Sequence, residues 1–498
     1  MKKSFISVLA AILFLCATAV LILASCSSEG SHGIELQSED DISGLRVATV
    51  AGSCYDIDLS PRTDISLSLF NTASDMLQAL LNHQADVIVD DETIFNSEIR
   101  RDNRIRIACK GSKLFPTALT FRKDEADIAE TFNAVQRRMH EDGSMEQLKL
   151  FWLTDEYLEE KVHTHIPPEE SGEPLRVASI VNMAPLAFMV EDDWFGLETD
   201  LVRQLAKELK RPLDIKLYEA ASGLMALSSG QVDVLIGGLF ITPERQETFI
   251  FADPYHSYRS AYFVLDTEAE ESGAGFWQKI GKSLEKNLIT EKRWKYITSG
   301  LWETVKITLL SIFFGAILGA GICAMTRSSR KWIRSVAGFY NWLMAGIPML
   351  VLLLILFYVV FAKSGIDPTL VAVVAFALNF ASGASDVYNS SLDSVPQGQT
   401  EAGLALGFTK LQTFLRIVFP QALTRGIPLF QGQCISLLKG TSIVGYIAIQ
   451  DLTRAGDLIR SRTFDAFVPL LVVTVIYFIL AWLLGLLIRS AYPKKHVL

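Results

Sequence analysis

A polar segment between Ser394 and Pro420 separates two long apolar runs and is punctuated by glycine and proline. It reads Ser394-Val-Pro-Gln-Gly-Gln-Thr-Glu401-Ala-Gly-Leu-Ala-Leu-Gly407 and, nine residues later, Ile417-Val-Phe-Pro420. The amphipathic start and the breakers predict a short helix, a turn and a second helix on one side of a membrane. Such a segment can bind another protein through noncovalent contacts. The alternative is an ordinary amphipathic cytoplasmic helix.

The chain offers no residue set for covalent catalysis. No nucleophile and base form a recognisable pattern, and no cysteine pair has metal-ligand spacing. The phosphate-binding pattern Gly-x-x-x-x-Gly-Lys-Ser/Thr is absent; the stretch from Gly275 to Ser283 comes closest, but its gap is five residues. We therefore expect neither enzymatic activity nor a metal or other cofactor.

Half of the 498 residues are apolar, and the net charge is −9. The apolar excess lies after residue 296, so the chain combines a soluble part with a membrane part. The acidic balance gives no electrostatic case for nucleic acid as a partner. Of six scattered cysteines, Cys54 and Cys109 would share an oxidising compartment and could pair. A free buried cysteine is the alternative.

The N-terminus carries two lysines, an apolar run from Phe5 to Ala24 and the ending Leu-Ala-Ser-Cys26. This pattern predicts a signal peptide over residues 1–26. The ending is similar to a bacterial lipobox, in which Cys26 is acylated and becomes the new N-terminus. An uncleaved anchor is the alternative, because the run is about long enough to span a membrane. Both predict that the next domain is exported.

Two segments begin alike, with Leu-Arg-Val-Ala at Leu45 and again at Leu175. Each continues with a helical pattern and a second short, β-branched strand. Strand, helix and strand at this spacing predict βαβ units and two largely parallel sheets. We expect two α/β lobes, over residues 42–160 and 172–266, joined by a proline-rich linker.

The rest of the chain is predicted to be an all-α domain of five membrane helices, over residues 297–490. Residues 276–296 precede it as an interfacial helix with aromatic side chains among lysines. Basic residues after the first span and at the C-terminal end predict that both lie in the cytoplasm. We expect a multi-pass protein of the bacterial inner membrane with its lobes outside. The apolar runs are 298–325, 336–362, 368–388, 427–449 and 467–488.

The spacing of the polar segment resembles the EAA coupling loop of ABC-importer permeases of the His/Glu/Gln/Arg/opine type. That loop reads Glu-Ala-Ala, three residues, Gly, nine residues, Ile-x-Leu-Pro; here Gly403 replaces the second Ala and Phe419 replaces Leu. The resemblance implies docking into a separate cytosolic ATPase subunit and a permease homodimer. The coupling residues it implies are Gln399, Glu401, Ala402, Gly407 and Pro420.

Residues 175–265 resemble one lobe of a type II periplasmic binding protein for polar amino acids. The motifs are Gly196-Leu-Glu-Thr-Asp-Leu and Ile241-Thr-Pro-Glu-Arg245, with a Gly-Gly pair between them. Residues 45–153 resemble the other lobe and the C-terminal return of that family. In the family these pieces follow the first lobe, whereas here they precede it. We therefore expect a permuted two-lobe domain; a degenerate tandem is the alternative.

The resemblance also implies a site for an amino-acid-like solute, which needs a cation for its carboxylate and an anion for its ammonium group. Arg245 would clamp the carboxylate, with Thr242 and backbone amides such as that of Gly238 helping. Asp91 would take the ammonium group from the other lobe, and the turn at Ser53 would add N–H donors. The alternatives are a solvated loop arginine for Arg245 and a turn or N-cap aspartate for Asp91.

Several positions depart from these families. Phe240 stands where a carboxylate-binding threonine is usual, Met183 where an aromatic residue often packs, and Ile180 where an acid is frequent. The permease part has Ala345 and Asn389 where the family has arginine. The lobe departures favour a more apolar or modified ligand.

The sequence thus predicts the membrane subunit of an ABC importer fused to its own binding protein. It would import an amino acid or related small carboxylate with ATP hydrolysed by a separate subunit. A ligand-gated channel or sensor can also join such lobes to membrane spans. That alternative predicts a pore loop or a signalling domain rather than an EAA-like loop.

Overall fold

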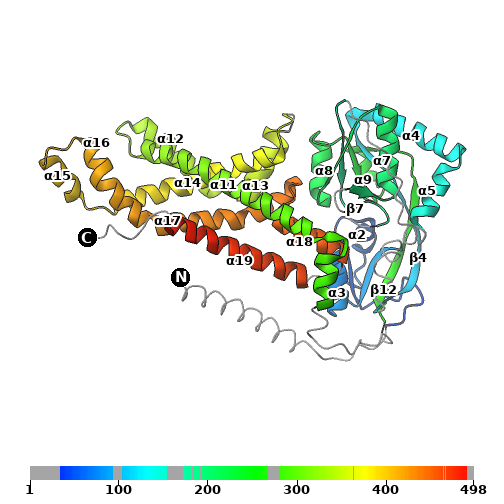
Figure 1. The fold of residues 1–498 in the computed structure, drawn as a ribbon. Helices are drawn as coiled ribbons and strands as arrows, with labels where there is room; N and C mark the ends of the chain where they lie inside the picture. Colours follow the sequence, from blue (N-terminus) through cyan, green and yellow to red (C-terminus); the bar gives the residue numbers. More distant parts are fainter. Residues whose placement is uncertain are drawn as a thin grey trace. The chain divides into compact units, whose positions relative to one another are not determined.

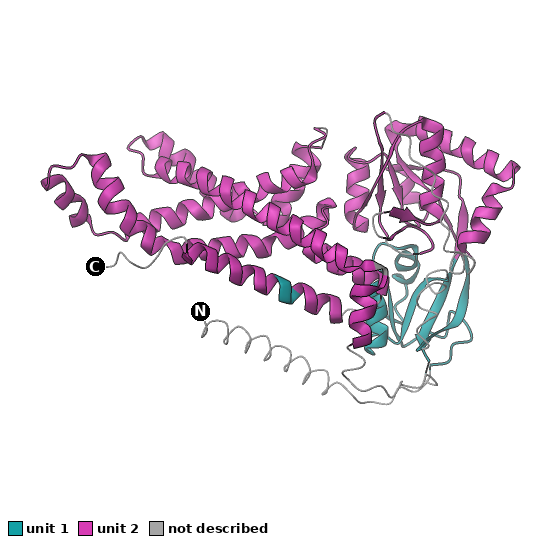
Figure 2. Ribbon diagram, in the orientation of Figure 1, with its two compact units in different colours: residues 1–113, 259–275, 474–476 teal, residues 114–258, 276–473, 477–498 magenta. Residues whose placement is uncertain are grey.

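The chain forms two compact units in the computed structural model (Figure 2). The first unit holds residues up to Lys113 and Arg259–Gly275, with Thr474–Ile476; the second holds the rest. The predicted signal peptide and Cys26 lie outside the described residues. Those residues are 34–92, 104–153, 172–181, 184–190, 193–266, 281–362, 364–463, 465 and 467–490.

A five-stranded sheet forms the first unit, in the order β2-β1-β3-β12-β4 (Figure 1). β1 runs parallel to β2 and β3, whereas β12 is antiparallel to β3. Val47, Val87 and Val89 are buried, as a parallel sheet covered on both faces requires. The division between the two units falls within β4 and β12. The elements are β1 (Arg46–Val50), α2 (Cys54–Leu59), β2 (Ser66–Phe70), α3 (Ala73–Leu81), β3 (Val87–Asp91), β4 (Ile105–Thr117) and β12 (His256–Leu265).

A second five-stranded sheet, in the order β11-β5-β10-β6-β9, lies in the second unit. The α/β fold predicted for both segments is therefore confirmed. The strands are β5 (Thr120–Arg122), β6 (Leu175–Ser179), β9 (Leu213–Leu217), β10 (Val234–Ile236) and β11 (Phe249–Phe251), with a hairpin of β7 (Phe188–Val190) and β8 (Asp193–Phe195). The helices are α4 (Ala126–Glu141), α5 (Ser144–Leu153), α7 (Leu197–Leu209), α8 (Ala220–Ser228) and α9 (Pro243–Gln246).

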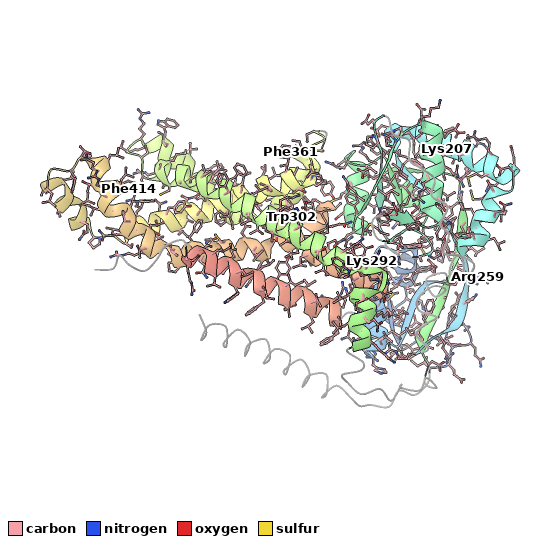
Figure 3. All side chains as sticks on the ribbon, in the orientation of Figure 1. Lys207, Arg259, Lys292, Trp302, Phe361 and Phe414 are labelled. Atoms are coloured by element: carbon pink, nitrogen blue, oxygen red, sulfur yellow. The ribbon has the colours of Figure 1, made fainter. Side chains whose placement is uncertain are left out.

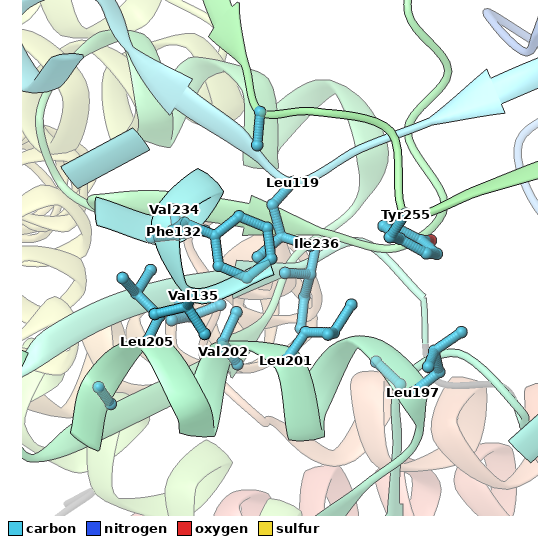
Figure 4. Close-up of a cluster of buried hydrophobic side chains, with 14 of the residues drawn as sticks. Leu119, Phe132, Val135, Leu197, Leu201, Val202, Leu205, Val234, Ile236 and Tyr255 are labelled. Carbon is cyan, nitrogen blue, oxygen red and sulfur yellow. The ribbon is translucent and has the colours of Figure 1, made fainter. Parts of the chain in front are cut away.

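Residues on both sides of the predicted linker share the core of this second sheet (Figure 4). Phe132 and Val135 of α4 pack with Leu201 of α7 and Val234 of β10. Trp152 of α5 belongs to the same buried cluster. The segment preceding residue 154 is therefore built into the lobe that follows residue 172.

The helical part has three helices long and apolar enough to cross a membrane among the described residues, or up to five if each of two bent pairs is one span. The three are α11 (Trp294–Thr326), α14 (Pro368–Asp393) and α19 (Phe467–Ser490). The bent pairs are α12 (Lys331–Gly346) with Met349–Val360, at 105°, and Lys410–Ile447 with α18 (Leu452–Thr463), at 53°. The second and fourth predicted spans fall in these bent pairs. Their parts include α13 (Met349–Ile355), α16 (Lys410–Thr413) and α17 (Phe419–Gly440).

The helices carry large apolar side chains on their outer faces, as contact with lipid requires (Figure 3). Trp302 of α11 is 67% exposed, and Phe414 lies exposed between α16 and α17. The described end of the predicted interfacial helix is not one continuous helix. Residues 281–284 are α-helical, Glu285–Ile289 form a π-helix and Thr290–Lys292 form a 3-10 helix, before α11 begins.

Gly300 of α11 lies against the backbone of Asp451. A Cβ added there would stand 2.5 Å from the carbonyl oxygen of Asp451, which cannot rotate away as a side chain could. Gly300→Ala should therefore separate α11 from α18 and lower the melting temperature of the detergent-purified chain. Gly321→Ala on the same helix has nothing within 4 Å and is the control. It should change stability by no more than the roughly 1 kcal/mol of helix propensity. Equal melting temperatures for the two variants would contradict this packing.

Candidate functional site

The loop between β10 and α9 brings three of the predicted solute-binding residues together. Thr242 caps α9, because its Oγ1 accepts a hydrogen bond from the backbone N of Arg245 at 3.3 Å. The Arg245 guanidinium, which is half-buried, donates through Nη1 to the carbonyl oxygen of Phe240 at 3.1 Å. A guanidinium has five N–H donors in a planar fork, a geometry that matches a carboxylate.

Gly238, the third predicted residue, contacts a buried carboxyl group that sequence reasoning missed. Its N–H lies 3.1 Å from both carboxyl oxygens of Glu198 on α7, and the N–H of Gly237 donates to Glu198 Oε2 at 2.6 Å. The hydroxyl of Tyr255 donates to Oε1 at 2.8 Å. Burial raises the pKa of Glu198 to about 7, against the opposing effect of these hydrogen bonds. Glu198 stands inside the motif that begins at Gly196, but its burial depends on the tertiary structure.

Asp91 ends β3 in the first unit, where it is 5% exposed and its backbone pairs with Ser260. Its N–H donates to Asp90 Oδ1 at 2.9 Å. Asp90 is also buried, and its Oδ2 has no hydrogen-bond partner among the described residues. Burial and the neighbouring charge of Asp91 raise the pKa of Asp90 well above its usual range. Two adjacent buried carboxyl groups therefore occupy this strand end.

Ser53 caps the six-residue helix α2 of the first unit. Its Oγ accepts a hydrogen bond from the backbone N of Asp56 at 3.1 Å, and Thr49 Oγ1 lies 3.5 Å away. Gly52, at φ +71°, donates its N–H to Asp56 Oδ2 at 2.8 Å. In this turn, which we expected to add N–H donors for the solute, the N–H of Gly52 and the side chain of Ser53 thus make local capping bonds.

The departures in the lobe have structural reasons. The ring of Phe240 packs edge-on against Phe115 and Tyr258, with centroids 5.9 and 6.5 Å apart. Ile180 packs on the glycine turn, since a Cβ at Gly237 would stand 2.5 Å from its Cγ1. Met183 lies outside the described residues.

Cys109 carries a free thiol. The disulfide with Cys54 that the sequence left open is therefore not formed.

The helix, turn and second helix predicted at residues 394–420 are present. Helix α15 (Gln397–Ala405) is capped by Leu406 and followed by Gly407, whose φ is +84°. The N–H groups of Gly407 and Phe408 donate to the carbonyls of Leu404 and Gly403, at 3.0 and 3.1 Å. These bonds are typical of a left-handed C-cap. Helix α16 then starts with a capping box at Thr409.

Gly403 of α15 faces the second helix so closely that alanine would not fit without movement. An added Cβ would stand 2.6 Å from Thr413 Cγ2 and 2.8 Å from Ile417 Cδ1. This contact explains the glycine where the resemblance expects alanine. Gln399 Oε1 accepts a hydrogen bond from Gln421 Nε2 at 3.1 Å, which joins the two ends of the loop.

The outward face of the loop is open to another molecule. Glu401 and Ala402 are exposed, and Leu406 and Leu411 are 76% and 67% exposed. Pro420, the last predicted coupling residue, lies in the first turn of α17. An exposed acidic and apolar surface on a tightly packed helix pair is suited to docking.

Within the second unit, the lobe contacts the helical part. The hydroxyl of Tyr358 donates to the carbonyl oxygen of Ser222 at 3.2 Å. Gln231 Nε2 donates to the carbonyl oxygen of Phe357 at 3.1 Å. These bonds connect the lobe that carries Arg245 with the helices.

The helical part matches known transport proteins. Residues 311–494 match the family described as binding-protein-dependent transport system inner membrane component. The L-cystine transport system permease protein TcyB of Bacillus subtilis is 36% identical over 213 residues, which are 42% of this chain and 89% of that protein. The putative glutamine transport system permease protein GlnP of Rickettsia bellii is 26% identical over 41% of this chain and 94% of its own length. The crystal structure of an amino acid ABC transporter with histidines is 29% identical over 43% of this chain and 96% of its own, at a TM-score of 0.37.

Proposed function

Because the chain belongs to the family of binding-protein-dependent transport system inner membrane components, we propose that it is an ABC-importer subunit that takes up an amino acid or a related small carboxylate. The observation that carries the proposal is the identity to an L-cystine permease over nearly the whole length of that protein. The loop between Gln397 and Pro420 couples transport to ATP hydrolysis by a separate cytosolic subunit. Its packed helix pair and exposed outer face support that role.

The solute is captured by the two α/β lobes, outside the cytoplasm of a bacterial cell. Arg245 clamps its carboxylate, supported by the Thr242 cap and the turn at Gly238. Asp91 binds the ammonium group of the solute. It lies at the end of β3 next to Asp90, which is also buried. The permease domain pairs as a homodimer, and Cys26 is the site of lipid attachment.

The direct test of this function is uptake by liposomes that contain the chain and its co-purified ATPase. Labelled amino acids, L-cystine among them, should accumulate only when ATP is present on the side of the membrane that carries the Gln397–Pro420 loop. A ligand-gated channel, the alternative from another class, would instead pass ions on ligand addition without ATP.

We also propose that the lobes form one permuted binding protein. Support comes from the shared core, in which β5, α4 and α5 pack with elements that follow residue 172. A fragment of residues 42–266 should then bind one solute molecule per chain by titration calorimetry. It should also unfold in one transition, because each sheet contains strands from both sides of the predicted linker. Two sites and two independent transitions would favour a degenerate tandem of domains.

A further inference from the structure

Three hydrogen-bond donors converge on the buried carboxyl group of Glu198. It stands in the first turn of α7 and has no solvent exposure. The donors are the N–H groups of Gly237 and Gly238 and the hydroxyl of Tyr255, at 2.6 to 3.1 Å. Burying a carboxyl group costs free energy unless it is hydrogen-bonded, and these three donors supply the bonds.

The turn held by Glu198 has a conformation that only glycine adopts readily. Gly237 and Gly238 have φ angles of +129° and +71°. Their N–H groups point into the protein and need an acceptor there. A Cβ at Gly237 would also stand 2.5 Å from Ile180, so the turn cannot be filled by side chains instead. The carboxyl group therefore fixes this turn from inside.

The turn leads directly into the loop of Arg245. The N–H of Ala118 donates to the carbonyl of Leu239, and the N–H of Ile241 donates to the carbonyl of Pro116, at 3.3 and 3.0 Å. Between these bonds lies Phe240, whose carbonyl accepts the guanidinium of Arg245. A shift of the Gly237–Gly238 turn would therefore disturb the hydrogen bonds of Leu239 and Ile241. It would also move the Phe240 carbonyl that holds the Arg245 guanidinium.

We propose that Glu198 is a positioning residue for the solute site, and that its protonation changes the affinity for solute by altering the turn that leads to Arg245. This inference rests on the function proposed above for the lobes. An ionised carboxyl group accepts every bond seen here. A protonated one must donate from one oxygen, so it cannot accept from all of these donors.

Among the described residues of the neighbouring elements, few groups could titrate in its place. Tyr255 faces Glu198 directly from the segment before β12; its own pKa is raised well above the usual range, by burial first and then by the charge of Glu198. Tyr258, in β12, adds to that shift. On α7 itself, Asp200 is held by Arg203 at 2.9 Å and by Trp152 at 2.8 Å. Between Gly237 and the end of α9, the charged residues are Arg245 and the adjacent Glu244. With a pKa of about 7, Glu198 changes charge near neutrality.

The sign of the stability effect follows from the raised pKa. The unfolded chain has a glutamate pKa near 4.5, and the folded chain binds the proton up to about 7. This contribution is therefore fully present below pH 4.5 and is lost as the pH rises through about 7. Glu198→Gln keeps the shape and one carbonyl acceptor but does not titrate. Glu198→Ala leaves all three donors without their acceptor.

The test compares the full-length chain with Glu198→Gln and Glu198→Ala in detergent. Hydrogen exchange of the peptide that covers the turn is measured between about pH 6 and pH 8, corrected for intrinsic rates. In the wild type, protection of the turn should change across this range. The Gln variant has one acceptor oxygen, like the protonated form, and should keep a single level of protection across this range. The Ala variant should lose protection by at least about tenfold at every pH. Protection in the Ala variant equal to the wild type would overturn the positioning role.

Solute affinity is measured on the same three proteins with the amino acid, from the twenty and L-cystine, that most raises the wild-type melting temperature. The wild type should show a pH-dependent Kd across this range, and the Gln variant a flat one. An identical pH profile for wild type and Gln variant would overturn the proton-linked part. If no amino acid raises the melting temperature of any variant, the proposed solute class fails. The exchange data then still decide the role of Glu198, because they need no solute.

Discussion

Gly407→Val should abolish solute transport while solute binding to the lobes stays at the wild-type level. Gly407 follows the C-cap of α15 at φ +84°, a conformation that costs an L-residue about 1–2 kcal/mol and a β-branched residue more. Nothing lies within 4 Å of its Cβ position, so the effect comes from the backbone and not from a clash. To escape that strain, the turn must rearrange and move α16 away from α15. The measurement is ATP-dependent uptake by proteoliposomes beside equilibrium binding of the same solute.

Matched variants separate this explanation from general damage. Gly407→Asn should keep most of the transport, because asparagine tolerates left-handed φ better than other residues. Gly398→Ala, on the same loop, has open space and no positive φ, so it should behave as the wild type. Glu401→Lys reverses an exposed charge and should abolish transport while solute binding to the lobes stays intact. Wild-type transport by Gly407→Val with the ATPase still bound would refute the coupling assignment.

Arg245→Ala should weaken solute binding by at least tens of fold. Removing one partner of a desolvated charge pair costs roughly 2–5 kcal/mol, or about 30-fold to several-thousand-fold in affinity. The half-buried guanidinium is steadied by the carbonyl of Phe240, so its fork is already oriented. Arg245→Lys should recover only part of the affinity, because a lysine cannot make the two parallel bonds of a guanidinium. Titration calorimetry with amino acids measures both.

The control for lost charge is Arg138→Ala, since Arg138 is exposed on α4 and pairs with Glu208 at 2.7 Å. Its affinity for solute should stay within about twofold of the wild type. Asp91→Asn should weaken binding of free amino acids but not of their amine-blocked forms. An unchanged Kd for Arg245→Ala would remove the carboxylate clamp and, with it, most of the case for an amino-acid-like solute.

Local patterns along the chain were enough to predict several features of the fold. Short β-branched runs at Leu45 and Leu175 became β1 and β6, each at the centre of a parallel set of strands. Glycine and proline between residues 394 and 420 marked a real helix–turn–helix. Such signals survive because they depend on backbone preferences and on periodicity within a few residues.

The tertiary structure decided what those signals cannot encode. The pairing of β5 between β10 and β11 joins residues over one hundred positions apart, and no local pattern specifies such a register. The bend of 105° divides the apolar run 336–362, which composition alone presents as continuous. The acceptor role of Glu198 and the absence of room at Gly403 arise only when distant segments pack together. Burial and hydrogen-bond partners are properties of that packing, so a residue type such as Glu198 acquires its chemistry only in the folded chain.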